Sequence, residues 1–196
     1  NMHTTNPCVT LCLRTLDHPK ISLSSYYNLG MKILMSPLSQ NDQKMLEGLL
    51  VAAGIGLIIQ HKASISGSIG GCQAETGSAA AMGSGAIVYC LGGNITQVFN
   101  AVAITIQCTL GLVCDPVAGL VEVPCIVRNA SAVAIAFSSA QIAIADGDPV
   151  IPVDECVVAM GEIGENMESK YKETALGGLA ATPTAQEIFQ KVHHKN

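Results

Sequence analysis

Residues 74–112 read AETGSAAAMGSGAIVYCLGGNITQVFNAVAITIQCTLGL, and this stretch decides the fold. After Glu75 it contains no formally charged residue, and its small and apolar side chains recur at helical spacing. Gly92-Gly93 is typical of the C-terminal end of a helix, and Asn94 is typical of the residue that caps the next one. The stretch therefore predicts two buried helices of small residues, one on each side of this turn.

Helical spacing also extends beyond this stretch, so we expect an all-α protein. Helices are predicted over about 41–60, 74–91, 94–112, 129–145 and 152–172, with a short final helix towards Val192. The loops between them are rich in glycine, and the β-branched residues of 117–127 leave a strand possible there. The fold class is thus a compact helical domain of buried small-residue helices held by glycine-rich loops.

Two parts of the chain differ in pattern. Residues 1–40 contain three prolines, a polar serine run and no sustained period, which indicates an atypical N-terminal arm. Residues 41–196 carry the helical pattern and form the predicted domain. We therefore place a boundary near residue 40.

Composition excludes several classes of protein. Hydrophobic residues make up 49% of the 196 residues and charged ones only 13%, which argues against disorder. A net charge of −5, without a basic run, argues against a nucleic-acid partner. The uncharged runs are interrupted by glycine and polar residues and lack flanking Lys/Arg clusters, so buried helices are favoured over membrane spans. With no evident secretory signal and eight cysteines, the chain is expected to be cytoplasmic with reduced thiols.

Three cysteines lie beside glycine or proline turns. They are Cys72 in Gly71-Cys72-Gln73, Cys114 in Val113-Cys114-Asp115-Pro116, and Cys125 in Pro124-Cys125-Ile126. A turn lets the backbone approach a bulky inorganic group, so the three thiolates are candidate ligands of an iron–sulfur cluster. The alternative is that each is a small buried side chain. Packing roles are expected for Cys90, Cys108 and Cys156, and no role is assigned to Cys8 and Cys12 in the arm.

Long phrases of residues about 45–183 resemble the alpha chain, or C-terminal catalytic domain, of the iron–sulfur L-serine dehydratases. The phrases are Ala63-Ser64-Ile65-Ser66-Gly67, Gly71-Cys72-Gln73-Ala74-Glu75, the run from Gly111 to Cys125, Arg128-Asn129-Ala130, Ile151-Pro152 and the run from Glu173 to Ala180. The resemblance implies a [4Fe-4S] cluster on Cys72, Cys114 and Cys125, with no pyridoxal phosphate. It also implies a cytoplasmic lyase that converts L-serine to pyruvate and ammonia and contributes to gluconeogenesis.

Four further residues are candidates for binding the substrate because of their places in the sequence. Ser64 and Ser66 precede Cys72 in a polar loop and could bind the substrate carboxylate, or could only shape the turn. For Arg128 a structural ion pair with Asp115, Glu122 or Glu75 is favoured over a substrate contact. Asn129 could bind substrate or cap a helix. The general base is not assigned.

Residues 1–40 depart from the family, which carries an Ala-Pro-Thr segment upstream of this region. We therefore expect activity to require a beta chain or domain, in a homo- or hetero-oligomer. Three alternatives remain open from the sequence. They are a non-catalytic or incomplete cluster-binding relative, a cysteine desulfidase-like enzyme, and a small membrane protein.

Overall fold

The computed structural model describes residues 42–193. The predicted arm of residues 1–40, with Cys8 and Cys12, lies outside the described residues, so the boundary near residue 40 stays a prediction.

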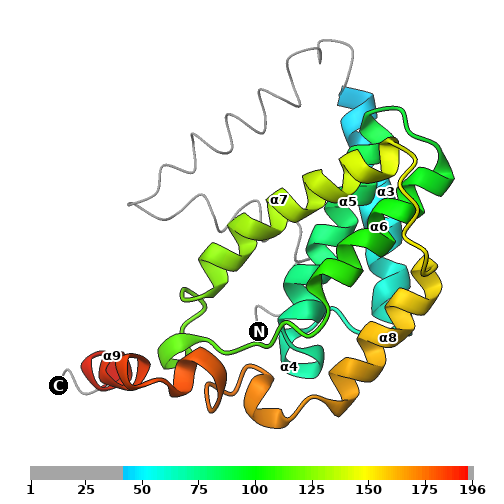
Figure 1. Ribbon diagram of the computed structural model, residues 1–196. Coiled ribbons are helices and arrows are strands. Elements are labelled where there is room, and N and C mark those ends of the chain that lie inside the picture. Colours follow the sequence, from blue (N-terminus) through cyan, green and yellow to red (C-terminus); the bar gives the residue numbers. More distant parts are fainter. Residues whose placement is uncertain (1–41, 194–196) are drawn as a thin grey trace.

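The regular elements of the described residues are all helices, which confirms the all-α prediction (Figure 1). The α-helices are α3 (Asp42–Lys62), α4 (Gly67–Gly70), α5 (Ser78–Cys90), α6 (Ile95–Thr109), α7 (Cys125–Ile144), α8 (Val153–Asn166) and α9 (Pro183–His193). Between them lie the π-helix η2 (Gln73–Gly77) and the 3-10 turns η3 (Val117–Gly119), η4 (Ser169–Tyr171) and η5 (Gly178–Ala181). In residues 42–193 the only β-type pairing is an isolated bridge between Cys114 and Lys172. The possibility of a strand in residues 117–127 is therefore wrong.

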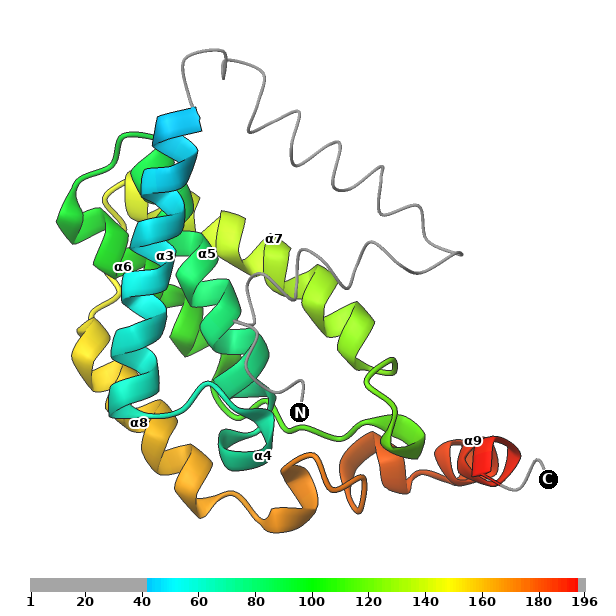
Figure 2. The ribbon, with the colours of Figure 1, turned by 180° about the vertical axis from the view of Figure 1, so that it is seen from behind.

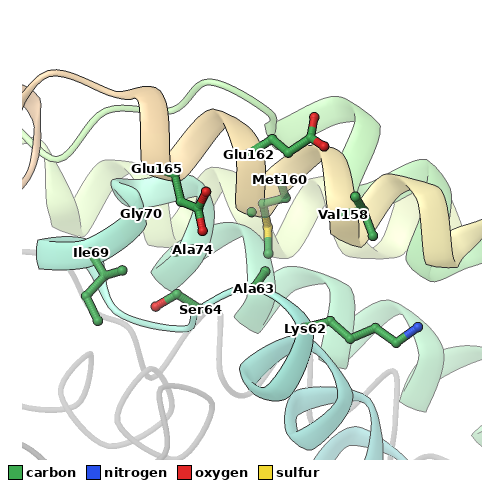
Figure 3. Close-up of a pocket in the computed structure, with 12 residues that line it drawn as sticks. Lys62, Ala63, Ser64, Ile69, Gly70, Ala74, Val158, Met160, Glu162 and Glu165 are labelled. Carbon is green, nitrogen blue, oxygen red and sulfur yellow. The ribbon is translucent and has the colours of Figure 1, made fainter.

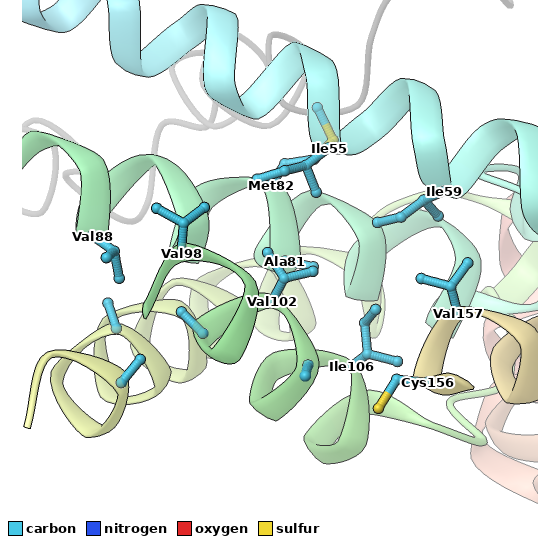
Figure 4. Close-up of a cluster of buried hydrophobic side chains, with 14 of the residues drawn as sticks. Ile55, Ile59, Ala81, Met82, Val88, Val98, Val102, Ile106, Cys156 and Val157 are labelled. Atoms are coloured by element: carbon cyan, nitrogen blue, oxygen red, sulfur yellow. The ribbon is translucent and has the colours of Figure 1, made fainter. Parts of the chain in front are cut away.

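Helix α5 is the centre of the bundle and packs against α3, α6 and α7 (Figures 1 and 2). Because its residues are small, the neighbouring helices approach closely, and side chains of α3 and α6 fill the space between them (Figure 4). Ile55, Val102 and Ile106 are at most 6% exposed, and full burial of such a side chain contributes about 1.5–3 kcal/mol. The small-residue core predicted from the sequence is therefore confirmed.

The ends of two helices differ from the sequence prediction. Helix α7 begins at Cys125 instead of 129, because Pro124 can take the capping position without losing a helical hydrogen bond. Helix α8 ends at Asn166 instead of 172, since Met167 adopts an extended backbone. The Met167 sulfur lies 2.7 Å from where a Cβ on Gly71 would stand, so this bend seats Met167 against the turn before Cys72.

The C-terminal residues form a separate small packing unit. Helix α9 contacts η3 and η5 at the end of the molecule away from the core of the bundle (Figure 1). Its Ala185 is buried with Val117 and Ala118 of η3, and a ring nitrogen of His193 lies 3.1 Å from the Ala118 carbonyl. This unit therefore covers the loop that connects Cys114 to Cys125.

Two of the described helices, Lys44–Lys62 and Cys125–Ile144, have the length and hydropathy that a membrane span requires. Core helices of soluble proteins also meet these criteria, so the finding is weak evidence for a membrane. The prediction that no membrane is bound stays a prediction.

Candidate functional site

The three predicted cysteine ligands come from three different parts of the fold. Cys72 is the residue before η2, Cys114 forms the bridge with Lys172, and Cys125 is the first residue of α7. Their side chains are 3%, 4% and 9% exposed. Each thiol is thus held on a separate backbone segment and largely shielded from solvent.

Cys72 and Cys114 are in direct contact. The Cys114 thiol donates a hydrogen bond to the Cys72 sulfur and, with further contacts from Thr76 and Arg128, lowers the pKa of Cys72 to about 6 despite its burial. The same hydrogen bond, followed by burial, raises the pKa of Cys114. Within the pair, the negative charge is therefore favoured on Cys72 and the proton on Cys114.

Cys125 lies within electrostatic reach of this pair. Burial, followed by the charges of Cys72 and Glu75, raises the pKa of Cys125 to about 11, while the charge of Arg128 opposes them. The Glu75 carboxylate also lies close to Cys114, because a Cβ on Gly67 would stand 2.7 Å from Glu75 Oε2 and 3.3 Å from Cys114 Sγ. The structure thus brings all three predicted cysteines into one neighbourhood.

Arg128 forms the structural ion pair that the sequence favoured. Its Nη1 lies 2.7 Å from Asp115 Oδ1 and donates to the Val113 carbonyl at 2.7 Å. The second Asp115 oxygen accepts the Leu179 N–H at 2.7 Å. Arg128 is therefore held against the segment that carries Cys114, where its charge also favours the Cys72 thiolate.

Asn129 lies inside α7, so the interpretation of Asn129 as a helix cap is wrong. Its Oδ1 accepts a hydrogen bond of 3.3 Å from Thr76 Oγ1, and the same hydroxyl lies 3.7 Å from Cys72 Sγ. Thr76 thus connects Asn129 to the thiol site. The sequence analysis missed Thr76, although it lies four residues after Cys72 and so could have been expected on the same helical face.

Ser64 and Ser66 shape a local turn, in which Ser64 Oγ accepts the Ser66 N–H at 3.1 Å. Ser66 also contacts Ser68 through their hydroxyls at 2.8 Å. Ser66 precedes Gly67, which faces Cys114. Ser64 instead lines a cleft of about 180 Å³ between the end of α3 and α8 (Figure 3). The cleft does not include the three cysteines, so Ser64 lies on a different side of the loop from the thiol site.

The other described cysteines lie away from this site. Cys156 is buried as predicted and its thiol lies 3.6 Å from the Ile151 carbonyl, while Cys90 is half-buried. Cys108 is exposed, so its predicted packing role is wrong in this chain.

Within residues 42–193 no three His, Cys, Asp or Glu side chains converge closely enough to hold a single metal ion. A single ion requires all its ligands within about 2–2.5 Å of one point. An iron–sulfur cluster differs, because each thiolate binds a different iron. The absence of a single-ion site among these residues is therefore compatible with a cluster on the three thiols.

Residues 27–180 match the family model described as serine dehydratase alpha chain. The chain belongs to the serine dehydratase alpha chain family. The match includes residues 27–40 of the predicted arm and the whole site described above.

Curated relatives support this family. The chain is 52% identical over 141 residues to the L-serine dehydratase alpha chain of Peptoniphilus asaccharolyticus, covering 72% of this chain and 48% of the relative. It is 48% identical over 155 residues to a probable L-serine dehydratase alpha chain of Bacillus subtilis, covering 79% and 52%. An L-serine dehydratase of Streptomyces coelicolor is 48% identical over 133 residues, covering 67% and 29%. This serine dehydratase family member thus spans about half the length of the first two relatives.

Proposed function

We propose that this chain is the cluster-bearing subunit of an L-serine ammonia-lyase, which converts L-serine to pyruvate and ammonia. The observation that supports this most directly is the meeting of Cys72, Cys114 and Cys125 from three separate segments, in a chain of the serine dehydratase alpha chain family. The names of the relatives supply the substrate.

The three cysteines fit a [4Fe-4S] cluster. Thiolates are the usual ligands of such a cluster, and Cys72 is already held in its thiolate form by Cys114, Thr76 and Arg128. Cys114 and Cys125 keep their protons because they are buried beside that negative charge. Binding iron would release these two protons, and the positive charge of the metal would neutralise the thiolates that form.

A cluster held by three thiolates would leave one iron open as a Lewis acid for the serine hydroxyl, so that no pyridoxal phosphate is needed. Around it, this chain's own residues bind and orient the substrate. The Asn129 amide and the hydroxyl of Ser66 are proposed to hold the substrate carboxylate, while Ser64 shapes the turn that presents Ser66. Arg128 is proposed to stabilise the Cys72 thiolate and to add positive charge at the site.

A beta chain or domain is proposed to complete the substrate pocket. The relatives from P. asaccharolyticus and B. subtilis are named alpha chains, and the longer S. coelicolor relative is named L-serine dehydratase without a chain designation. We infer a homo- or hetero-oligomer in the cytoplasm, without a nucleic-acid or membrane partner.

Anaerobic reconstitution tests the proposal. The purified chain is incubated with ferrous iron and sulfide, mixed with a beta chain, and assayed for pyruvate from L-serine, with L-cysteine as the competing substrate. Changing Cys72, Cys114 or Cys125 to Ala should abolish both the iron–sulfur absorbance and pyruvate formation. Cys108→Ala, at an exposed thiol away from the site, should retain both.

Other results would assign a different function. A chromophore without pyruvate would indicate a non-catalytic relative, and a strong preference for L-cysteine would indicate a desulfidase. A full chromophore in any of the three Cys→Ala variants would overturn the ligand set.

A further inference from the structure

Gln73 is a fully buried polar side chain at the start of η2, next to Cys72. Its Nε2 donates to the Met160 carbonyl of α8 at 3.0 Å, and its Oε1 accepts the Gly111 N–H at 2.9 Å. Its backbone N–H donates to the Leu112 carbonyl at 2.9 Å. One residue therefore joins η2, α8 and the loop after α6.

These hydrogen bonds fix the loop that leads to Cys114. Gly111 and Leu112 lie three and two residues before Cys114, and both are held by Gln73. Gly111 adopts a φ of +80°, a conformation that favours glycine, so the chain reverses here after α6. The contacts of Gln73 thus help to set the position of the Cys114 thiol relative to Cys72, beside the Arg128 bond to Val113 and the bridge between Cys114 and Lys172.

We propose that Gln73 is a positioning residue that holds the Cys114 loop against the Cys72 turn, so that the two thiols meet at the distance the site requires. The role given to Gln73 rests on the proposed function, because the two thiols that it positions are the proposed cluster ligands. The contact itself exists in the chain without any bound group.

Glutamine suits this position because its side chain carries one acceptor and two donors at the same end. Met has a similar length and no hydrogen-bonding amide, so Gln73→Met would leave the Gly111 N–H and the Met160 carbonyl without this partner. The loop would then lose its side-chain anchor at Gly111 and keep only the backbone hydrogen bond from residue 73 to the Leu112 carbonyl, so it would be held less firmly against Cys72.

Gln97 offers a matched control. Its Nε2 also joins two segments, donating to the Ile144 carbonyl at 3.2 Å and to Asp146 Oδ1 at 2.9 Å. It lies near the start of α6, roughly 18 Å along the helix axis from the end that leads to Gly111. Gln97→Met therefore removes a bridging glutamine of the same chemistry at a place remote from the thiols.

The test measures how readily Cys72 and Cys114 pair in the full chain without iron. The protein is equilibrated with reduced and oxidised glutathione, so that each disulfide formed reduces one glutathione disulfide to two thiols, and the pair is quantified by peptide mass spectrometry. We expect Gln73→Met to lower the equilibrium constant for pairing about ten-fold, and Gln97→Met to leave it unchanged. After iron and sulfide are added, the visible absorbance should be reduced in Gln73→Met alone.

Equal pairing in the Gln73→Met and wild-type proteins would overturn the proposal, as would a wild-type chain that does not pair these thiols. If Gln73→Met does not fold, hydrogen exchange of the wild-type protein decides, because the Gly111 N–H must exchange slowly if Gln73 holds it. Exchange at the rate of an exposed amide would overturn the proposal. A wild-type chain that pairs the thiols but forms no chromophore would contradict the proposed function and leave the role of Gln73 supported.

Discussion

Asp115 and Arg128 form a 2.7 Å ion pair in which the aspartate is 2% exposed and the arginine 21%. Asp115 follows Cys114 directly, and Arg128 lies three residues after Cys125 on α7. The other Asp115 oxygen accepts the Leu179 N–H, so the same carboxylate also fixes the C-terminal segment. This buried pair thus connects both segments of the loop that presents Cys114 and Cys125.

Removing the charge of Asp115 should destabilise the fold. Asp115→Asn leaves the Arg128 guanidinium half-buried without its carboxylate, and loss of one partner of a buried pair costs about 3–5 kcal/mol. Asp154→Asn is the control, because its 2.9 Å pair with Lys62 is exposed and contributes less than about 1 kcal/mol. Urea denaturation of the iron-free proteins measures both, and similar losses in the two variants would contradict the prediction.

Gly71 should tolerate a side chain much less well than Gly92. Both have a φ in the left-handed region, +75° and +86°, where alanine costs about 1–2 kcal/mol. A Cβ on Gly71 would also lie 2.8 Å from the Leu112 carbonyl and 2.7 Å from the Met167 sulfur, whereas Gly92 has open space around it. Gly71→Ala should therefore lower stability by about 2–3 kcal/mol and Gly92→Ala by about 1 kcal/mol. Thermal denaturation of the two variants checks this difference.

The sequence was sufficient to predict the helical fold because α5 is apolar on all sides, the apolar residues of α6 repeat with the helical period, and the Gly92-Gly93 turn separates the two helices. The end of α8 was not predictable in the same way. Met167 leaves the helix to pack on Gly71, which is distant in sequence, and no local signal marks that contact. Tertiary packing thus decided the boundary that propensity left open.

The candidate site shows a similar division. Turns beside Cys72, Cys114 and Cys125 made them candidates, but only the folded chain places Cys72 in contact with Cys114. The preference for an Arg128 ion pair was correct, since a charge in an apolar region needs a partner. The link from Thr76 to Asn129 depends on how η2 meets α7, which residue spacing does not encode.

The iron-free protein should lose stability at alkaline pH because of Cys125. Its folded pKa is raised from 9.0 to about 11, so the proton is kept in the folded state after the unfolded chain has released it. The contribution of the Cys125 proton to the free energy of unfolding is fully present below pH 9 and is lost as the pH rises towards 11. By pH 10 the difference in unfolding free energy between wild type and Cys125→Ala should have fallen by about 1 kcal/mol from its value at pH 8. Urea midpoints at both pH values measure it, and a constant difference would contradict the assignment.

Asn129 should affect the binding of L-serine more than its turnover. Its Oδ1 is held by Thr76, which leaves Nδ2 as the group that can donate to a substrate carboxylate. A hydrogen bond to a charged group contributes about 1.5–3 kcal/mol. Asn129→Ala should therefore raise KM by about ten-fold or more, with a smaller change in kcat. Thr76→Val should shift KM in the same direction, because it frees the Asn129 side chain. The control is Asn166→Ala, where the amide donates only to the Glu162 carbonyl at the exposed end of α8. If Asn129→Ala changed KM no more than Asn166→Ala does, Asn129 would have a structural role alone.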